Sequence, residues 1–130
     1  MPRADPNAFS CRSLAAPSAT NVPSPMILAG ILSTPRGSGA KRRAAIRHSW
    51  LQYPGVGKHL FACFVIGARG LSRRRRRGMD AKDILWLDVE EPGILTMIKV
   101  FAWWQAAARV PWISHAVKID DDSYGEAAHP

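Results

Sequence analysis

The sequence predicts an α/β fold in which a parallel sheet of about four strands is flanked by helices. Apolar runs of strand length alternate along the chain with stretches of helical periodicity. The apolar runs are continuous, which is typical of strands that a parallel sheet buries on both faces. The length of 130 residues fits one domain at most.

Four apolar runs are expected to be the strands of this sheet. Each is short, rich in aliphatic or aromatic residues, and bounded by glycine, proline or charged residues. The expected strands are residues 26–34, 59–69, 83–89 and 112–119.

Two segments between these runs are expected to be helices. Residues 40–51 follow Ser38, a residue type suited to the N-cap position. Residues 93–110 form a long apolar segment that Pro111 ends. Its apolar stripe at helical spacing consists of Ile94, Met97, Ile98, Phe101, Trp104 and Ala108.

The N-terminal stretch differs in composition from the rest. Residues 1–25 are rich in Pro, Ala and Ser without periodicity, so we expect a disordered leader. They lack the apolar centre of a signal peptide, and no run in the sequence approaches the roughly 18 apolar residues of a membrane span. Cys63 lies in an expected strand and is interpreted as a buried free thiol, with pairing to Cys11 as the alternative.

Five consecutive arginines, from Arg73 to Arg77, dominate the charge of the chain. Subtracting them from the net charge of +8 leaves +3, which is ordinary. The block is interpreted as a solvated, disordered loop, with a basic interaction patch as the alternative. A nucleic-acid-binding module built on it is therefore the alternative function, although no aromatic residue is interleaved for base stacking.

Three adjacent carboxylates, Asp120, Asp121 and Asp122, follow the last expected strand. In open parallel sheets, ligands bind beyond the carboxyl ends of the strands. Close carboxylates repel one another, and a divalent cation such as Mg²⁺ or Mn²⁺ relieves this while sharing them with a substrate phosphate. The alternative is a solvated acidic turn.

Cations crowd the start of the first expected helix, where they oppose the helix dipole. A bound phosphate would reverse the sign of that effect. Together with the acidic turn, this pattern indicates a nucleoside diphosphate and its metal, while the alternative is a surface helix with surplus arginine. No catalytic nucleophile is recognisable. The cations are Arg36, Lys41, Arg42, Arg43 and Arg47.

Four segments in the same order resemble the β-1,3-galactosyltransferase family. ILSTPRGSGAKRRAAIRHSW resembles its opening block, and FVIG resembles its second strand. DILWLDVEEPGILTMIKVFAWW is similar to a segment with Asp-Ile-Leu and Leu-Thr-x-Lys, and VKIDDDSY is similar to a Lys-x-Asp-Asp-Asp block. The resemblance covers residues 26–124.

This resemblance implies the Rossmann-like, nucleotide-binding half of a GT-A glycosyltransferase. Such an enzyme transfers galactose or N-acetylhexosamine from a UDP-sugar to a glycan, glycoprotein or glycolipid acceptor, usually with Mn²⁺ and in the Golgi. Asp120 and Asp122 would be the metal ligands. The residues implied beside the nucleotide sugar are Ser33, Thr34, Arg43, Arg47 and Asp121.

The sequence also departs from the family pattern. Ile94 stands where an asparagine is expected, and residues 1–25 are expected to hold no counterpart of the family's membrane anchor. The family's catalytic domain continues beyond the aspartate block, so residues 26–130 are expected to be a partial domain that lacks the acceptor-binding half and full activity. A half-sheet of this kind is expected to expose an edge and apolar surface. A fragment that does not fold is the third interpretation.

Overall fold

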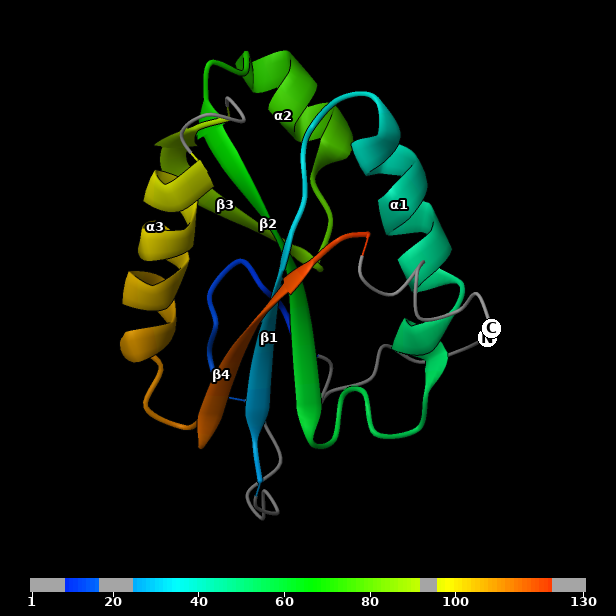
Figure 1. The fold of residues 1–130 in the computed structure, drawn as a ribbon, viewed down its shortest axis with the longest axis vertical. Helices are drawn as coiled ribbons and strands as arrows, with labels where there is room; N and C mark the ends of the chain where they lie inside the picture. Colours follow the sequence, from blue (N-terminus) through cyan, green and yellow to red (C-terminus); the bar gives the residue numbers. More distant parts are fainter. Residues whose placement is uncertain (1–8, 17–24, 92–95, 123–130) are drawn as a thin grey trace.

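A four-stranded parallel sheet lies between helices in the computed structural model, which describes residues 9–16, 25–91 and 96–122 (Figure 1). Neighbouring strands are all parallel, in the order β3-β2-β1-β4. Each strand overlaps its expected run, so the predicted α/β fold class is confirmed. The strands are β1, Ile27–Leu32; β2, Leu60–Arg69; β3, Ile84–Glu90; and β4, His115–Asp120.

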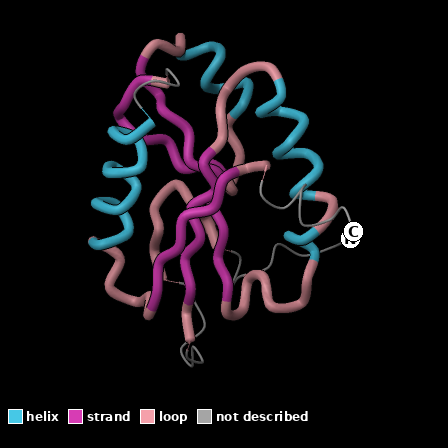
Figure 2. Tube along the Cα trace, in the orientation of Figure 1, coloured by secondary structure: helices cyan, strands magenta, loops and turns pink. Residues whose placement is uncertain are grey.

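The direction of strand addition reverses at β1. The chain builds β2 and then β3 on one side of β1, and afterwards returns to place β4 on the other side. Figures 1 and 2 show the consequence: α1, Ser38–Arg47, and α3, Thr96–Ala108, cover opposite faces of the sheet. The structure is thus layered as helix, sheet and helix.

The α1 face has a compact apolar core. Ile46 of α1 and Trp50 of the following 3₁₀ turn, Trp50–Gln52, pack with Ile31 and Phe64 of the sheet. The helix is shorter at its C-terminal end than expected. Ser38 is not its N-cap as predicted, because Gly37 occupies that position with φ of 60°, a conformation that glycine adopts most readily.

The α3 face is built around Trp103, which is completely buried against β1. A Cβ atom at Gly30 would overlap the Trp103 ring, so glycine at this strand position is what allows the helix to approach. Leu28, Cys63 and Val65 complete the centre of this core.

The predicted apolar stripe of α3 lies largely on its exposed side. Met97 is 84% exposed, and Trp104 is 41% exposed. Ile98 and Phe101 are exposed as well, whereas Ile94 lies outside the described residues. The helix is apolar nearly all round, so periodicity could not select the buried face. Within the described residues, none of the helices has the length and apolar character needed to span a membrane.

Residues 9–16 differ from the expected disordered leader, since they pack on the α3 face of the sheet. Cys11 forms a disulfide with Cys63, so the interpretation of Cys63 as a free thiol is wrong. Phe9 packs edge-on against Phe61 and Trp112. The prediction of disorder rested on the average composition of residues 1–25, in which these few apolar residues carry little weight. Residues 1–8 and 17–24 lie outside the described residues.

The arginine block forms a helix and not the predicted loop. This helix is α2, Arg73–Met79, and Ser72 caps it by accepting a hydrogen bond from the backbone N–H of Arg75 at 3.2 Å. Arginine is a good helix former, and one serine cap is enough to start the turn once the flanking strands fix its ends.

Candidate functional site

The carboxyl ends of β1 and β4 meet where the strand order reverses. Leu32 and Asp120 are register partners, so Ser33 and Asp121 leave the sheet from adjacent strand ends. The chain then turns into α1 on one face, whereas α3 precedes β4 on the other face. Such a reversal opens the crevice in which open α/β sheets bind their ligands.

Ser33 receives a buried cation from each face of the sheet and is itself only 1% exposed. Arg43 of α1 donates to Ser33 Oγ, at 2.8 Å, and to the Thr34 carbonyl. Lys99 of α3 donates to the Ser33 carbonyl. The turn after β1 is therefore held by side chains from two helices that lie on opposite faces of the sheet.

Lys99 has a carboxylate partner. Its Nζ lies 2.5 Å from Glu91 Oε1, and the same oxygen accepts a hydrogen bond from the Gly67 N–H at 2.6 Å. Burial lowers the pKa of Lys99, and the hydrogen bond that Lys99 donates to Glu91 opposes that shift. The pair is a buried ionic link between α3 and the carboxyl ends of β1 and β2.

Arg43 faces neutral oxygens instead. Within the described residues its guanidinium hydrogen bonds reach only Ser33 Oγ and the Thr34 carbonyl. Burial lowers the pKa of Arg43 and the charge of Arg47 adds to this, whereas the charges of Asp121 and Asp83 raise it. A buried guanidinium without a hydrogen-bonded carboxylate leaves positive potential at the end of β1.

The acidic turn contacts the basic helix. Asp121 is largely buried, with a side-chain exposure of 10%, and its Oδ1 lies 3.2 Å from Arg42 Nη1. Burial raises the pKa of Asp121, and Arg42 opposes the shift. Asp120 and Asp122 are exposed, with Lys118 Nζ at 3.4 Å from Asp120. These two carboxylates are thus open to an incoming ligand.

A complete metal cage is not formed by protein side chains in the described part of the chain. No three His, Cys, Asp or Glu side chains gather there closely enough to hold an ion. Asp120 and Asp122 could still supply one or two oxygen ligands, which suits a metal that completes its shell with phosphate and water.

Arg47 forms an ion pair near β3, at the edge of the sheet opposite β4. Its guanidinium makes two hydrogen bonds of 2.7 Å to the Asp83 carboxylate, directly before β3. It also lies over the Phe64 ring, 5.1 Å from the centroid. The hydrogen bond to Asp83 raises the pKa of Arg47. The structure therefore brings Ser33, Thr34 and Arg43 together and places Asp121 beside α1, whereas Asp120 lies beside Lys118 and Arg47 pairs with Asp83.

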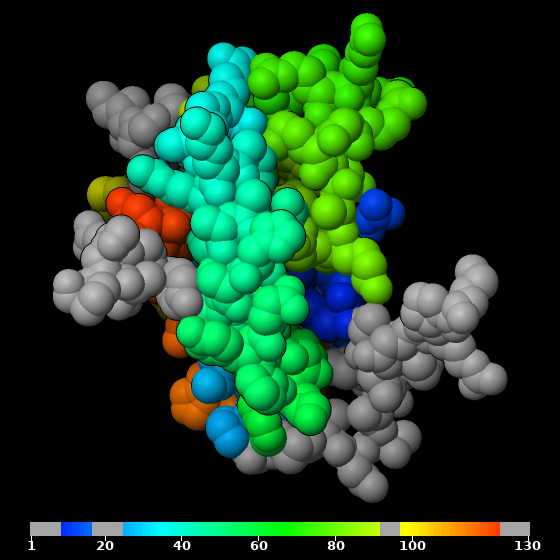
Figure 3. Space-filling model, turned by 90° about the vertical axis from the view of Figure 1, so that its right-hand side faces the viewer, coloured from blue at the N-terminus to red at the C-terminus, as the bar shows by residue number. Residues whose placement is uncertain are grey.

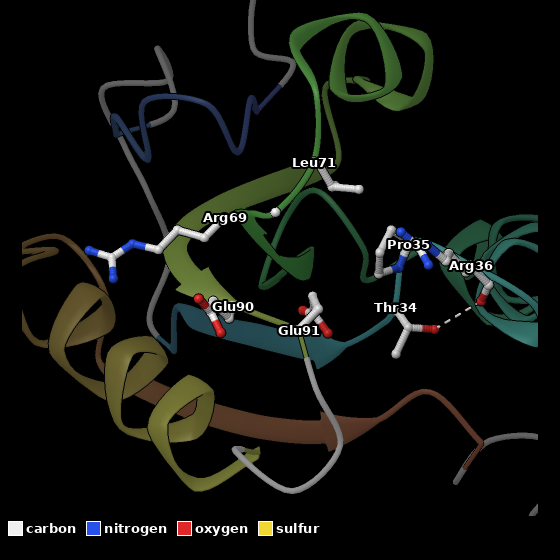
Figure 4. Close-up of a pocket in the computed structure, with 8 residues that line it drawn as sticks. Thr34, Pro35, Arg36, Arg69, Leu71, Glu90 and Glu91 are labelled. Atoms are coloured by element: carbon white, nitrogen blue, oxygen red, sulfur yellow. Dashed lines mark hydrogen bonds between the residues drawn. The ribbon is translucent and has the colours of Figure 1, made fainter.

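A hollow of approximately 460 Å³ adjoins this site at the carboxyl ends of β1, β2 and β3 (Figure 4). The Arg69 side chain points away from Thr34 in this view and pairs with Asp88 at 2.8 Å. The hollow is lined by Thr34, Pro35, Arg36, Arg69, Gly70, Leu71, Glu90 and Glu91.

Sequence reasoning missed the buried link between Lys99 and Glu91. A single lysine inside an otherwise apolar helix was the available signal, since such a cation is rarely buried without a partner. The sequence could not name Glu91 as that partner, because only the crossing of α3 over the strand ends brings the two together.

No protein-family model matches this chain, and no solved structure matches it significantly.

Proposed function

We propose that the chain binds a UDP-sugar through a divalent cation, as the donor-binding part of a hexosyltransferase of the β-1,3-galactosyltransferase type. The observation that carries the proposal is the approach of Asp121, in the middle of the acidic turn, to Arg42 and the buried cation Arg43 at the point where the strand order reverses. A diphosphate with its metal complements this arrangement, since the metal would bind the carboxylates and the diphosphate would face the positive charge of Arg43.

Asp120 and Asp122 are proposed to hold the cation, for which Mn²⁺ is the expected ion. Both side chains are exposed, so neither needs to leave a buried partner to bind it. The donor set of carboxylate oxygens fits a hard divalent ion. When bound, this ion neutralises the charge that develops on the departing diphosphate.

The protein side chains around the turn would orient the nucleotide. Arg43 contributes a fixed positive charge and holds Ser33 and Thr34 in place. The exposed Thr34 hydroxyl donates to the Arg36 carbonyl at 3.2 Å, which shapes the turn that faces the hollow. The adjoining hollow is large enough for a nucleoside, as ligand pockets generally exceed about 300 Å³.

The reaction would be the transfer of galactose or N-acetylhexosamine to a hydroxyl of a glycan, glycoprotein or glycolipid. A direct attack by that hydroxyl needs no covalent protein nucleophile, and we assign no catalytic base. The disulfide between Cys11 and Cys63 supports an oxidising compartment such as the Golgi lumen.

Calorimetric titration of the full chain with UDP, with and without Mn²⁺, tests the proposal. We expect binding that requires the metal and that weakens by more than about tenfold in Asp122→Ala. The matched control is Asp88→Ala, which removes an exposed aspartate of β3, the strand at the opposite edge of the sheet from β4. Metal-independent binding by the folded protein, no binding, or equal losses in both variants would refute the proposal.

A further inference from the structure

Helix α2 carries a dense positive charge that the rest of the described structure does not neutralise. All five of its arginines are exposed, and no acidic residue lies in the helix. Within the described residues, only Arg76 makes a side-chain contact, over the Trp86 ring at 5.6 Å from the centroid. The side chains of Arg73, Arg74, Arg75 and Arg77 make no ion pair or hydrogen bond there.

The helix fixes the backbone positions from which these side chains project. Ser72 caps its first turn, and Met79 at its end packs against the core of the α1 face. The following residue, Asp80, accepts a hydrogen bond from Trp86 Nε1 at 3.0 Å. Because the backbone is already ordered, a ligand that contacts several guanidinium groups need not order the chain first.

The surface around α2 extends the positive charge. Helices α1 and α2 lie side by side on one face of the molecule (Figure 3), and α1 contributes the exposed Lys41. The carboxylates at Asp83 and Asp121 are already engaged by Arg47 and Arg42. This face therefore suits a polyanion.

Two classes of polyanion fit poorly. Nucleic acid is disfavoured because a structural disulfide is typical of compartments that lack it, and because α2 has no aromatic side chain for base stacking. An anionic membrane is disfavoured because α2 presents no exposed apolar face to insert beside its charges.

We propose that α2 is a docking site for a sulfated polysaccharide. Guanidinium groups pair bidentately with oxyanions, and runs of basic residues are typical of heparin-binding patches. The inference is independent of the donor site, since Arg73, Arg74, Arg75 and Arg77 contact none of the residues assigned to the nucleotide. A failure of UDP binding would leave it unaffected.

The test measures binding of the full chain to heparin as a function of salt. The patch variant combines Arg73→Gln, Arg74→Gln and Arg77→Gln, and glutamine preserves helix propensity. We expect this variant to bind heparin at least about tenfold more weakly near physiological salt, with a shallower dependence of affinity on salt. The wild-type protein should prefer heparin over its desulfated form.

The matched control removes the same number of charges elsewhere. It combines Lys58→Gln, Arg109→Gln and Lys118→Gln, which are exposed positions outside α2. Retained heparin binding in this control supports the proposal. Equal weakening in both triple variants would overturn it, because net charge alone would then explain the binding.

Two further measurements keep the proposal falsifiable. Lysine at the same three positions keeps the charge and should restore most of the affinity, which separates loss of charge from loss of folding. Random-sequence DNA and phosphatidylserine vesicles are titrated at the same salt concentrations. If either binds the wild-type patch as tightly as heparin does, the assignment to a sulfated polysaccharide is wrong.

Discussion

The two faces of the sheet are stabilised by different interactions. On the α1 face, arginines of the helix pair with Asp83 and Asp121 around a compact apolar core. On the α3 face, a buried Trp103 and the disulfide of Cys11 to Cys63 dominate a larger apolar core.

The residues that contribute most to stability therefore lie on a different face of the sheet from the charged residues of the proposed site. Apolar burial is strong and non-directional, so the α3 face stabilises the sheet without orienting charged groups. Ion pairs at partly exposed positions add little stability but fix the direction of charged groups. The α1 face therefore supplies the oriented charges of the proposed site, and both faces meet at Ser33 through Arg43 and Lys99.

The largest expected effect concerns two adjacent tryptophans of α3. Trp103→Ala should lower the free energy of unfolding by about 3–5 kcal/mol, because it empties the centre of the α3-face core. Trp104→Ala removes a partly exposed ring, 41% exposed, and should lower it by less than about 2 kcal/mol. Urea denaturation followed by circular dichroism compares them. Equal losses would contradict the assignment of the buried face.

The second-largest expected loss of stability comes from removing the disulfide. Replacing Cys11 and Cys63 together with alanine should lower the free energy of unfolding by about 2–4 kcal/mol, since a crosslink between residues 52 apart restricts the unfolded chain. A reductant should lower the melting temperature of the wild-type protein and leave that of the double variant unchanged. If the reductant left the wild-type melting temperature unchanged, the crosslink would not stabilise the α3 face.

The smallest expected change in stability concerns Lys99, the α3 residue that donates a hydrogen bond to the Ser33 carbonyl. Lys99→Met should lower the free energy of unfolding by about 2 kcal/mol near neutral pH, because Glu91 and the Ser33 carbonyl lose a buried donor. Exposed Lys82→Met is the control and should change it by less than about 0.5 kcal/mol.

The same variant gives a pH dependence with a defined sign. Burial lowers the pKa of Lys99, so the folded protein releases this proton more readily than the unfolded chain. The contribution of Lys99 to stability should therefore rise as pH increases from the lowered pKa toward the ordinary value of 10.5. The difference between wild type and Lys99→Met should grow over that range, and a shrinking difference would contradict the direction of the shift.

Several features followed directly from the sequence. Continuous apolar runs and the breakers between them determined the strands, because a parallel strand buried on both faces leaves few positions for polar residues. The placement of Asp120, Asp121 and Asp122 at a strand end followed from the same pattern. These features depend on local composition and order along the chain.

Only the tertiary structure decided which partners those elements find. The disulfide of Cys11, the pairing of Arg47 with Asp83, the convergence on Ser33 and the buried side of α3 each join residues distant in sequence. Such choices depend on how helices cross the sheet and which polar groups must be satisfied once buried. An apolar helix or a row of arginines has several equivalent faces until packing selects one of them.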